Sequence, residues 1–370
     1  MNAESKNNFS LHGVADFSLS GTGPLFRYLA YQYENFLISE TNTVTGPADF
    51  SVTIAATASG DESDRILISG TEGYARSVDG EGFIWSVNNK AARLDGQQPL
   101  AKQTTLLFDP SFNKMKANVL CELFWRLSFV EKQIALVHAA CVAKGSEAIL
   151  LPAWKNVGKT ATCLKLIAAG SDFLADDRLW LRSDGVAFAF PRYVVLKDSN
   201  LTHFPEFSSL TTKIKLHTFG FLSRLSWVGD NALFKRVRRR FIRAQYFRIN
   251  DLYPAANVLS QSKVNKTVQL VKSRKSGKVE MRQADSTRTA STVSDIGDVE
   301  WNHSLQTLVS AHDILFPEGP CWSDELSALM HAERQVVREA LSSTQCHQLS
   351  MPEENSRLDW RILIQKLLGA

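Results

Sequence analysis

The chain has 370 residues, of which 44% are hydrophobic and 22% are charged, and its formal net charge is +4 at pH 7. This composition excludes wholesale disorder, a collagen-like repeat and a multispanning membrane protein. No apolar run approaches the roughly 18–20 residues that cross a bilayer as a helix, and the first residues lack the basic and apolar regions of a secretory signal peptide. We therefore expect a cytoplasmic protein without membrane contact, with two domains or one large α/β domain and an appendage.

Residues 1–110 predict a β-rich N-terminal domain. The segments 48–60, 64–73 and 80–90 alternate apolar and polar residues and are broken by Gly, Asp and Asn. Residues 111–133 predict a linking helix, because apolar residues recur every three or four positions from Met115 to Val130 and form one helical face. Residues 1–110 contain no cluster of catalytic residue types.

Residues 134–370 predict an α/β domain with a helical C-terminal part. Segments 134–143 and 148–154 indicate a hairpin of buried strands, followed by a helix from Gly158 to Ala169 that Gly170 ends. Further strands follow. We expect an edge hairpin and a loop over 261–295, a helix that begins after Ser323 as N-cap, and a last helix from about Arg357.

Five cysteines are scattered through the chain with no CxxC pair: Cys121, Cys141, Cys163, Cys321 and Cys346. The odd count and the spacing favour reduced thiols in a reducing compartment, and they indicate neither a disulfide framework nor a zinc site.

The strongest functional signal is a candidate phosphate loop between a predicted strand and a predicted helix. Its residues, Ala153, Trp154, Lys155, Asn156, Val157, Gly158, Lys159 and Thr160, match the pattern G-x-x-x-x-G-K-[ST] except at the first glycine. Such a loop turns backbone N–H groups toward a phosphate, and the helix N-terminus adds partial positive charge. In this pattern Lys159 reaches the β and γ oxygens of a nucleotide, and the Thr160 hydroxyl is placed to bind Mg²⁺.

Two adjacent carboxylates, Asp176 and Asp177, follow at the end of the apolar strand DFLA. Beside a phosphate loop, acids at a strand end can hold Mg²⁺ or accept the proton of an attacking hydroxyl. On an extended strand, adjacent side chains point to opposite faces, so both can serve one site only if the strand has ended in a turn there.

The segment LVHAACVAKGSEAILLPAWKNVGKTATCLKLIAAGSDFLADDRLWL resembles the core of the HPr serine kinase/phosphorylase-like proteins. The shared features are His138, the loop 153–160, the helix end at Gly170, and the pair Asp176–Asp177, in the family's order. The resemblance extends over about residues 134–200. The loop departs from the family's usual sequence at its first glycine, and the family's acidic motif after the Asp pair is absent from this sequence.

The resemblance implies a P-loop kinase core of the HPr kinase/carboxykinase-like type within residues 134–370. It also implies transfer of the γ-phosphate of ATP or GTP to a hydroxyl, often seryl, of a peptide, protein or small molecule. By position, Lys159 would bind phosphate and act in catalysis, Thr160 and Asp176 would bind Mg²⁺, and one carboxylate, with Asp177 favoured, would be the base. His138 occupies the position of an active-site histidine of the family, and its other reading is a buried strand residue.

Two alternatives to a kinase stay open. Residues 156–160 also fit a nucleotide-binding regulatory or switch protein without kinase activity, although no DxxG followed by NKxD comes after them. The run 235–248 holds seven basic residues and no acid, which fits a polyanion-binding surface. The sequence favours an acidic partner or nucleotide phosphates over nucleic acid for this run. Members of the resembled family often assemble, which leaves a homo-oligomer open.

Overall fold

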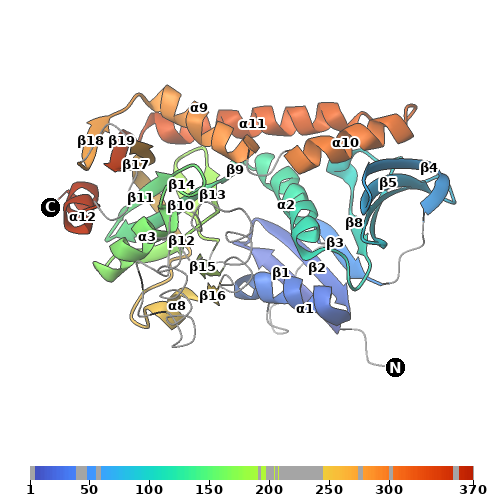
Figure 1. The fold of residues 1–370 in the computed structure, drawn as a ribbon, viewed down its shortest axis with the longest axis horizontal. Coiled ribbons are helices and arrows are strands. Elements are labelled where there is room, and N and C mark those ends of the chain that lie inside the picture. Colours follow the sequence, from blue (N-terminus) through green and yellow to red (C-terminus); the bar gives the residue numbers. More distant parts are fainter. Residues whose placement is uncertain are drawn as a thin grey trace, which may run out of the picture. The chain divides into compact units, whose positions relative to one another are not determined.

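The computed structural model of the protein describes residues 5–38, 48–55, 60–190, 193–196, 204, 207, 245–273, 278–299, 303–352 and 358–369. These residues form a mixed α/β protein (Figure 1), as the sequence predicts. The chain divides into two compact units, each made of several segments. Unit 1 comprises Met1–His138, Trp180–Phe188 and Ala284–Gln345, and unit 2 comprises Ala139–Leu179, Ala189–Gln283 and Cys346–Ala370.

Unit 1 is built on an eight-stranded sheet with the order β1-β2-β3-β8-β7-β6-β5-β4. The β2–β3 and β3–β8 pairs are parallel and the other pairs are antiparallel. The strands are β1 (Ser5–Leu11), β2 (Ala15–Gly21), β3 (Phe50–Ile54), β4 (Gly60–Ser69), β5 (Glu72–Ser77), β6 (Gly82–Val87), β7 (Lys90–Asp95) and β8 (Thr105–Phe108). Strands β9 (Ile134–Val137), β13 (Leu179–Arg182) and β14 (Val186–Phe188) lie next to one another in the order β14-β13-β9.

The helices of unit 1 bury apolar side chains against one another and against the sheet. They are α1 (Gly23–Gln32), α2 (Lys114–Val130), α9 (Ser286–Gly297), α10 (His303–Leu315) and α11 (Trp322–Ser342), with the short 3₁₀ helices η1 (Glu34–Phe36) and η2 (Leu100–Lys102). Trp125 of α2 is fully buried, and the centre of its ring lies 4.8 Å from that of Phe17 and 4.9 Å from that of Phe50. Helix α11 runs along α9 and α10 (Figure 1).

A buried ion pair joins α2 to α11 inside unit 1. Both Arg126 and Glu333 are buried, and the guanidinium donates from Nε at 2.9 Å and from a terminal nitrogen at 2.6 Å to the two carboxylate oxygens. A buried charge is tolerated only when it is paired and hydrogen-bonded, and this bidentate geometry satisfies both groups.

Unit 2 contains the sheet that carries the candidate site. Strands β12 (Asp172–Ala175), β10 (Ala139–Lys144), β11 (Glu147–Pro152) and β17 (Gln261–Ser273) lie in this order. Strand β10 is antiparallel to both β12 and β11, whereas β11 and β17 are parallel. Strand β19 (Gln345–Pro352) pairs with β17 and with β18 (Glu280–Gln283), and β15 (Val194–Leu196) pairs with β16 (Gln245–Phe247).

Helix α3 (Lys159–Ala168) covers this sheet, and its buried residues pack against β10 and β11 (Figure 1). The predicted end of the helix is confirmed. Gly170 has φ +89°, its N–H donates to the Ile167 carbonyl at 2.9 Å, and the Ser171 N–H donates to the Leu166 carbonyl at 3.1 Å. This is the Schellman pattern, for which glycine is the preferred residue because it adopts positive φ without strain. Helices α8 (Ile249–Leu252) and α12 (Trp360–Leu368) complete unit 2.

The prediction of an edge hairpin and a loop over residues 261–295 is wrong. Strand β17 has neighbours on both sides within unit 2, β11 and β19, so it is not an edge strand. Residues 286–297 form helix α9, which Asp285 begins by accepting a hydrogen bond from the Arg288 N–H at 2.8 Å. Its Ser and Thr hydroxyls donate to carbonyls one turn back, which removes their competition with the helix.

The start of helix α11 also differs from the prediction. Ser323 is not the N-cap, because the helix begins at Trp322 and the Asp313 carboxylate caps it from α10. The N–H groups of Trp322 and Ser323 donate to this carboxylate at 2.9 and 3.1 Å. Helix α12 begins at Trp360 with Asp359 as N-cap, and Arg357 lies outside the described residues.

In the part of the chain that the structure describes, no helix combines the length and the apolar character needed to cross a bilayer.

Candidate functional site

The segment 153–160 lies between β11 and α3, as the sequence predicts. Residues 153–158 connect the strand to the helix, and Lys159 and Thr160 are the first two residues of α3. Ala153 is fully buried and forms a parallel bridge with Leu270 of β17, so sheet pairing continues into the first residue of the loop. Ala153 is not among the residues with positive φ. An alanine therefore fits at the position where the usual pattern has glycine, since an extended backbone accommodates a Cβ.

A tight turn follows, in which the Val157 N–H donates to the Trp154 carbonyl at 3.3 Å. Asn156 has φ +65°, a left-handed conformation that asparagine tolerates better than most residues. Gly158 has φ +118°, and a Cβ placed on it would meet no atom within 4 Å. The glycine is therefore required by backbone conformation and not by lack of space.

Helix α3 begins directly after this turn. Gly158 is its N-cap and supplies no side-chain hydrogen bond to the first turn. The first N–H groups of an α-helix have no intrahelical acceptor and carry partial positive charge, so this end of the helix favours an anion. Trp154, Lys155 and Asn156 are exposed beside it.

Lys159 is 8% exposed and lies at the first position of α3. Its ammonium donates to Oδ1 of Asp177 at 3.1 Å and to the Asp177 carbonyl at 3.2 Å. The Asp177 side chain is 56% exposed. A nearly buried ammonium thus faces a carboxylate that solvent and solutes can reach.

Thr160 is paired with the other carboxylate. Its hydroxyl Oγ1 lies 3.1 Å from Oδ2 of Asp176, which is 8% exposed. Strand β12 ends at Ala175, and residues 176 and 177 form a bend. The bend meets the condition set by the sequence, because both carboxylates face residues at the start of α3.

The hydroxyl oxygen of Thr160 and the carboxylate oxygens of Asp176 are of the kind that Mg²⁺ prefers. Mg²⁺ is usually held by one or two carboxylates together with phosphate oxygens and water. Among the described residues, no three His, Cys, Asp or Glu side chains gather into a group that could hold a metal. Binding of Mg²⁺ by Thr160 and Asp176 therefore stays a prediction from the sequence.

The buried thiol of Cys163 is not activated as a nucleophile. Burial, together with the Asp176 carboxylate, raises the pKa of Cys163 well above its ordinary value. Its sulfur lies 3.8 Å from the Ala175 carbonyl, to which it donates. Cys163 is therefore an unactivated thiol that packs in the apolar core of unit 2.

Sequence reasoning missed Arg178. Its Nε lies 3.7 Å from Oδ2 of Asp177, and its side chain is 15% exposed. The missed signal was its position directly after the Asp pair, where the chain has left the strand and the next side chain can turn back toward the carboxylate.

Two further predictions from the sequence concern His138 and the basic run 235–248. His138 is 7% exposed and lies between β9 and β10 in the chain, as the last residue of the first segment of unit 1. Its catalytic role stays a prediction. In the basic run, residues 235–244 lie outside the described part of the chain.

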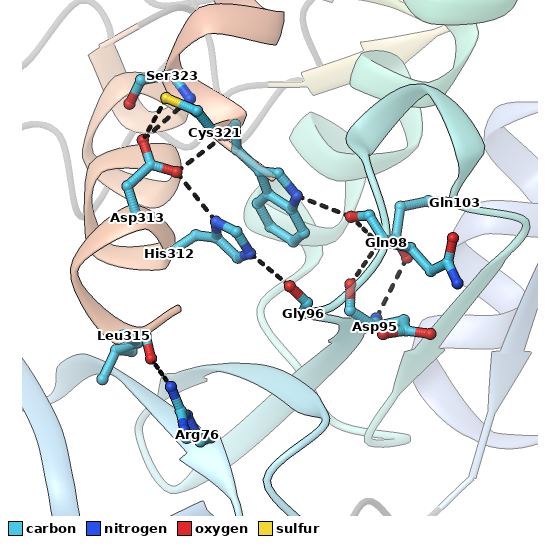
Figure 2. A network of polar contacts seen from close by, with 11 residues as sticks. Arg76, Asp95, Gly96, Gln98, Gln103, His312, Asp313, Leu315, Cys321 and Ser323 are labelled. Carbon is cyan, nitrogen blue, oxygen red and sulfur yellow. Dashed lines mark hydrogen bonds and ion pairs between the residues drawn. The ribbon is translucent and has the colours of Figure 1, made fainter. Parts of the chain in front are cut away.

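A second polar cluster, in unit 1, combines the side chains of His312, Asp313 and Cys321. Figure 2 shows His312 between two acceptors, the Gly96 carbonyl at 2.8 Å from Nε2 and Asp313 at 3.1 Å from Nδ1. The imidazole is fully buried, and its centre lies 3.6 Å from that of the Trp322 ring in a stacked arrangement. The Cys321 thiol donates to Asp313 at 3.6 Å.

This arrangement does not activate the thiol. The hydrogen bond of Cys321 goes to Asp313 and not to a histidine base. A backbone hydrogen bond from Asp324 lowers the pKa of Cys321, but desolvation and the carboxylates of Asp313 and Asp324 raise it on balance. The cluster therefore serves to cap α11 and to hold α10 against the loop after β7.

No family model matches the chain, and no curated protein matches it.

Proposed function

We propose that the protein is a nucleotide-dependent phosphotransferase with a P-loop kinase core of the HPr kinase/carboxykinase-like type. It transfers the γ-phosphate of ATP or GTP to a hydroxyl, seryl by the resemblance, of a peptide, protein or small-molecule acceptor. The observation that carries this proposal is the double pairing at the start of α3, Lys159 with Asp177 and Thr160 with Asp176.

The anion-binding part of the site supports binding of the nucleotide phosphates. The loop after β11 and the N-terminus of α3 offer backbone N–H groups, and Lys159 adds a full positive charge on a nearly buried stem. A charge in a partly desolvated position acts more strongly on a phosphate than the same charge in water. Thr160 and Asp176 would hold Mg²⁺, which when bound neutralises charge on the phosphate oxygens.

The different exposure of the two carboxylates supports different roles for them. Asp176 is buried beside Thr160, which suits a metal ligand, whereas the Asp177 side chain is 56% exposed and within reach of an acceptor. Asp177 is therefore the proposed base. It accepts the proton of the acceptor hydroxyl while the hydroxyl oxygen bonds to the γ-phosphorus, and the bond from phosphorus to the bridging oxygen breaks to release the nucleoside diphosphate.

The basic run 235–248 is proposed to meet an acidic or phosphate-bearing group of the acceptor or the nucleotide. Seven cations in 14 residues would give such a contact a strong salt dependence. Its role follows from sequence alone.

The proposal is tested with the full chain, Mg²⁺ and γ-³²P-labelled ATP or GTP, offered seryl peptides and small-molecule alcohols as acceptors. We expect labelled acceptor with the parent protein and none with Asp177→Asn, which keeps the shape of the side chain but loses the base. Nucleotide binding should stay within a few-fold in this variant. The matched control is Asp172→Asn at the start of the strand that precedes the bend. This carboxylate accepts a hydrogen bond from the Asn257 side-chain amide at 3.0 Å and lies outside the site.

Two results would contradict the proposal. Nucleotide hydrolysis with no labelled acceptor under any condition would favour the regulatory or switch protein. Labelling at the parent rate by Asp177→Asn would remove the proposed base from the reaction.

A further inference from the structure

Asp177 stands between two cations. Its Oδ1 accepts from the Lys159 ammonium at 3.1 Å, and its Oδ2 lies 3.7 Å from Nε of Arg178. The two carboxylate oxygens are thus divided between a lysine of the helix start and an arginine of the neighbouring bend. Lys159 is also the residue proposed to bind the nucleotide phosphates, so its contact with Asp177 bears on the proposed reaction.

The Lys159 ammonium cannot keep all its contacts to Asp177 and also bind a nucleotide phosphate fully. An ammonium has three N–H groups, and here two acceptors of Asp177, the carboxylate and the carbonyl, already take hydrogen bonds from it. A bound polyphosphate would compete with the carboxylate for the same ammonium. An acceptor hydroxyl, in turn, would have to share Oδ1 of Asp177 with the Lys159 ammonium.

We infer that Lys159 exchanges partners when nucleotide binds, and that Arg178 is the positioning residue that keeps Asp177 in place during the exchange. Lys159 turns from Asp177 to the phosphates, and the freed Oδ1 of Asp177 becomes available to the acceptor hydroxyl. The ion pair between Arg178 and Oδ2, which is longer than a hydrogen bond, is kept throughout. The base is thereby masked in the protein without nucleotide and is exposed by nucleotide binding. This inference rests on the proposed function, since it assumes that Lys159 binds nucleotide phosphate.

The exposed fractions of the side chains favour this direction of exchange. The Asp177 side chain is 56% exposed, whereas the Lys159 side chain is 9% exposed and that of Arg178 is 15% exposed. The carboxylate can therefore exchange its contact with Lys159 for water at small cost. The ammonium, being nearly buried, requires an anionic partner in either state.

The test is a pair of double-mutant cycles on nucleotide affinity, measured by isothermal titration calorimetry with Mg·ATP and with Mg·GTP on the full chain. Asp177→Asn should bind nucleotide about two- to fivefold more tightly than the parent, the range that a half-exposed ion pair supplies. The same substitution made together with Lys159→Ala should give no tightening. Tightening that persists without Lys159 would mean simple repulsion between Asp177 and the phosphates, and would overturn the exchange.

The second cycle concerns Arg178→Met. On its own, this substitution should weaken nucleotide binding about two- to fivefold, because the ion pair with Arg178 then no longer competes with the contact between Lys159 and Asp177. Combined with Asp177→Asn it should change nothing. Weakening in both backgrounds would mean that Arg178 itself binds the phosphates. No effect in either background would mean that Arg178 does not position Asp177. Arg178→Lys, which keeps the charge, should restore parent affinity.

Circular dichroism and thermal unfolding of every variant identify loss of folding separately. If the parent binds nucleotide but Asp177→Asn does not bind it more tightly, the exchange is wrong and the proposed kinase stands. If the parent binds neither nucleotide, the proposed function fails, and the exchange fails with it.

Discussion

Replacing Lys159 by alanine tests the site at a nearly buried charge. Lys159 would make a charge-assisted contact to the nucleotide phosphates, and one such contact contributes about 1.5–3 kcal/mol. Since about 1.4 kcal/mol corresponds to a factor of ten in the dissociation constant, affinity for Mg·ATP or Mg·GTP should fall about 10- to 150-fold. The measurement is isothermal titration calorimetry at fixed ionic strength.

The same variant should remain folded. Truncation removes buried methylene groups, each contributing about 0.8 kcal/mol, but it also removes a nearly buried ammonium whose desolvation is unfavourable. Asp177 keeps solvent and Arg178 as partners. We therefore expect the free energy of unfolding to change by no more than about 1–2 kcal/mol, as measured by denaturant titration.

Lys165→Ala is the matched control, because Lys165 lies on the same helix with its ammonium 4.5 Å from the centre of the Phe204 ring. Its removal should leave nucleotide affinity unchanged. Unaltered nucleotide affinity in a folded Lys159→Ala variant would refute the reasoning that places the phosphates at the start of α3.

The remaining predictions concern the metal and the stability of unit 1. Asp176→Asn should raise the Mg²⁺ concentration needed for half-maximal phosphotransfer before it affects metal-free nucleotide binding, and an unchanged Mg²⁺ titration would contradict its role. Gly96→Ala should lower the free energy of unfolding by about 1–3 kcal/mol in thermal melts, because the new Cβ would overlap the buried ring of Phe316. Gly70→Ala, where the new Cβ would meet no atom within 4 Å, should be neutral in the same melts. Asp313→Asn should cost about 1 kcal/mol at pH 7, as the loss of a helix cap does. Although burial raises the pKa of Asp313, hydrogen bonds from Ser323, His312 and the Trp322 backbone lower it on balance. This stabilisation is therefore complete above the unfolded pKa of about 3.9 and is lost as pH falls through the lower folded value, so parent and variant should converge in acid, and a difference that persists there would contradict the assignment.

The strand–loop–helix element could be predicted because its signals are local. The buried hairpin, the glycine that ends α3 and the run from Ala153 to Thr160 are set by residues close together in sequence, where propensity, turn chemistry and periodicity act. The failures have the opposite character. Residues 286–297 are rich in Ser and Thr and resemble a loop by composition, yet they form α9 because Val293 and Ile296 are buried against the rest of unit 1. Packing overrides a weak intrinsic preference.

Helix α11 illustrates the same limit at its first residue. Ser323 has the side chain expected of an N-cap, but the cap comes from Asp313, nine residues earlier than Trp322 and on another helix. A carboxylate that accepts two N–H groups stabilises the helix end more strongly than a serine hydroxyl, and only the packing of α10 brings it there.

The sequence by itself determined the order of chemical groups in the candidate site, a lysine and a threonine after a glycine turn and two carboxylates after a strand, because each group is fixed by its own short segment. Only the tertiary structure decided how these groups pair. The bend after Ala175 brings Asp176 to Thr160 and Asp177 to Lys159, and it turns Arg178 back onto the same carboxylate. Such pairing depends on the register of β12 beside β10 and on the placement of α3 over the sheet, which are long-range contacts that no local pattern encodes.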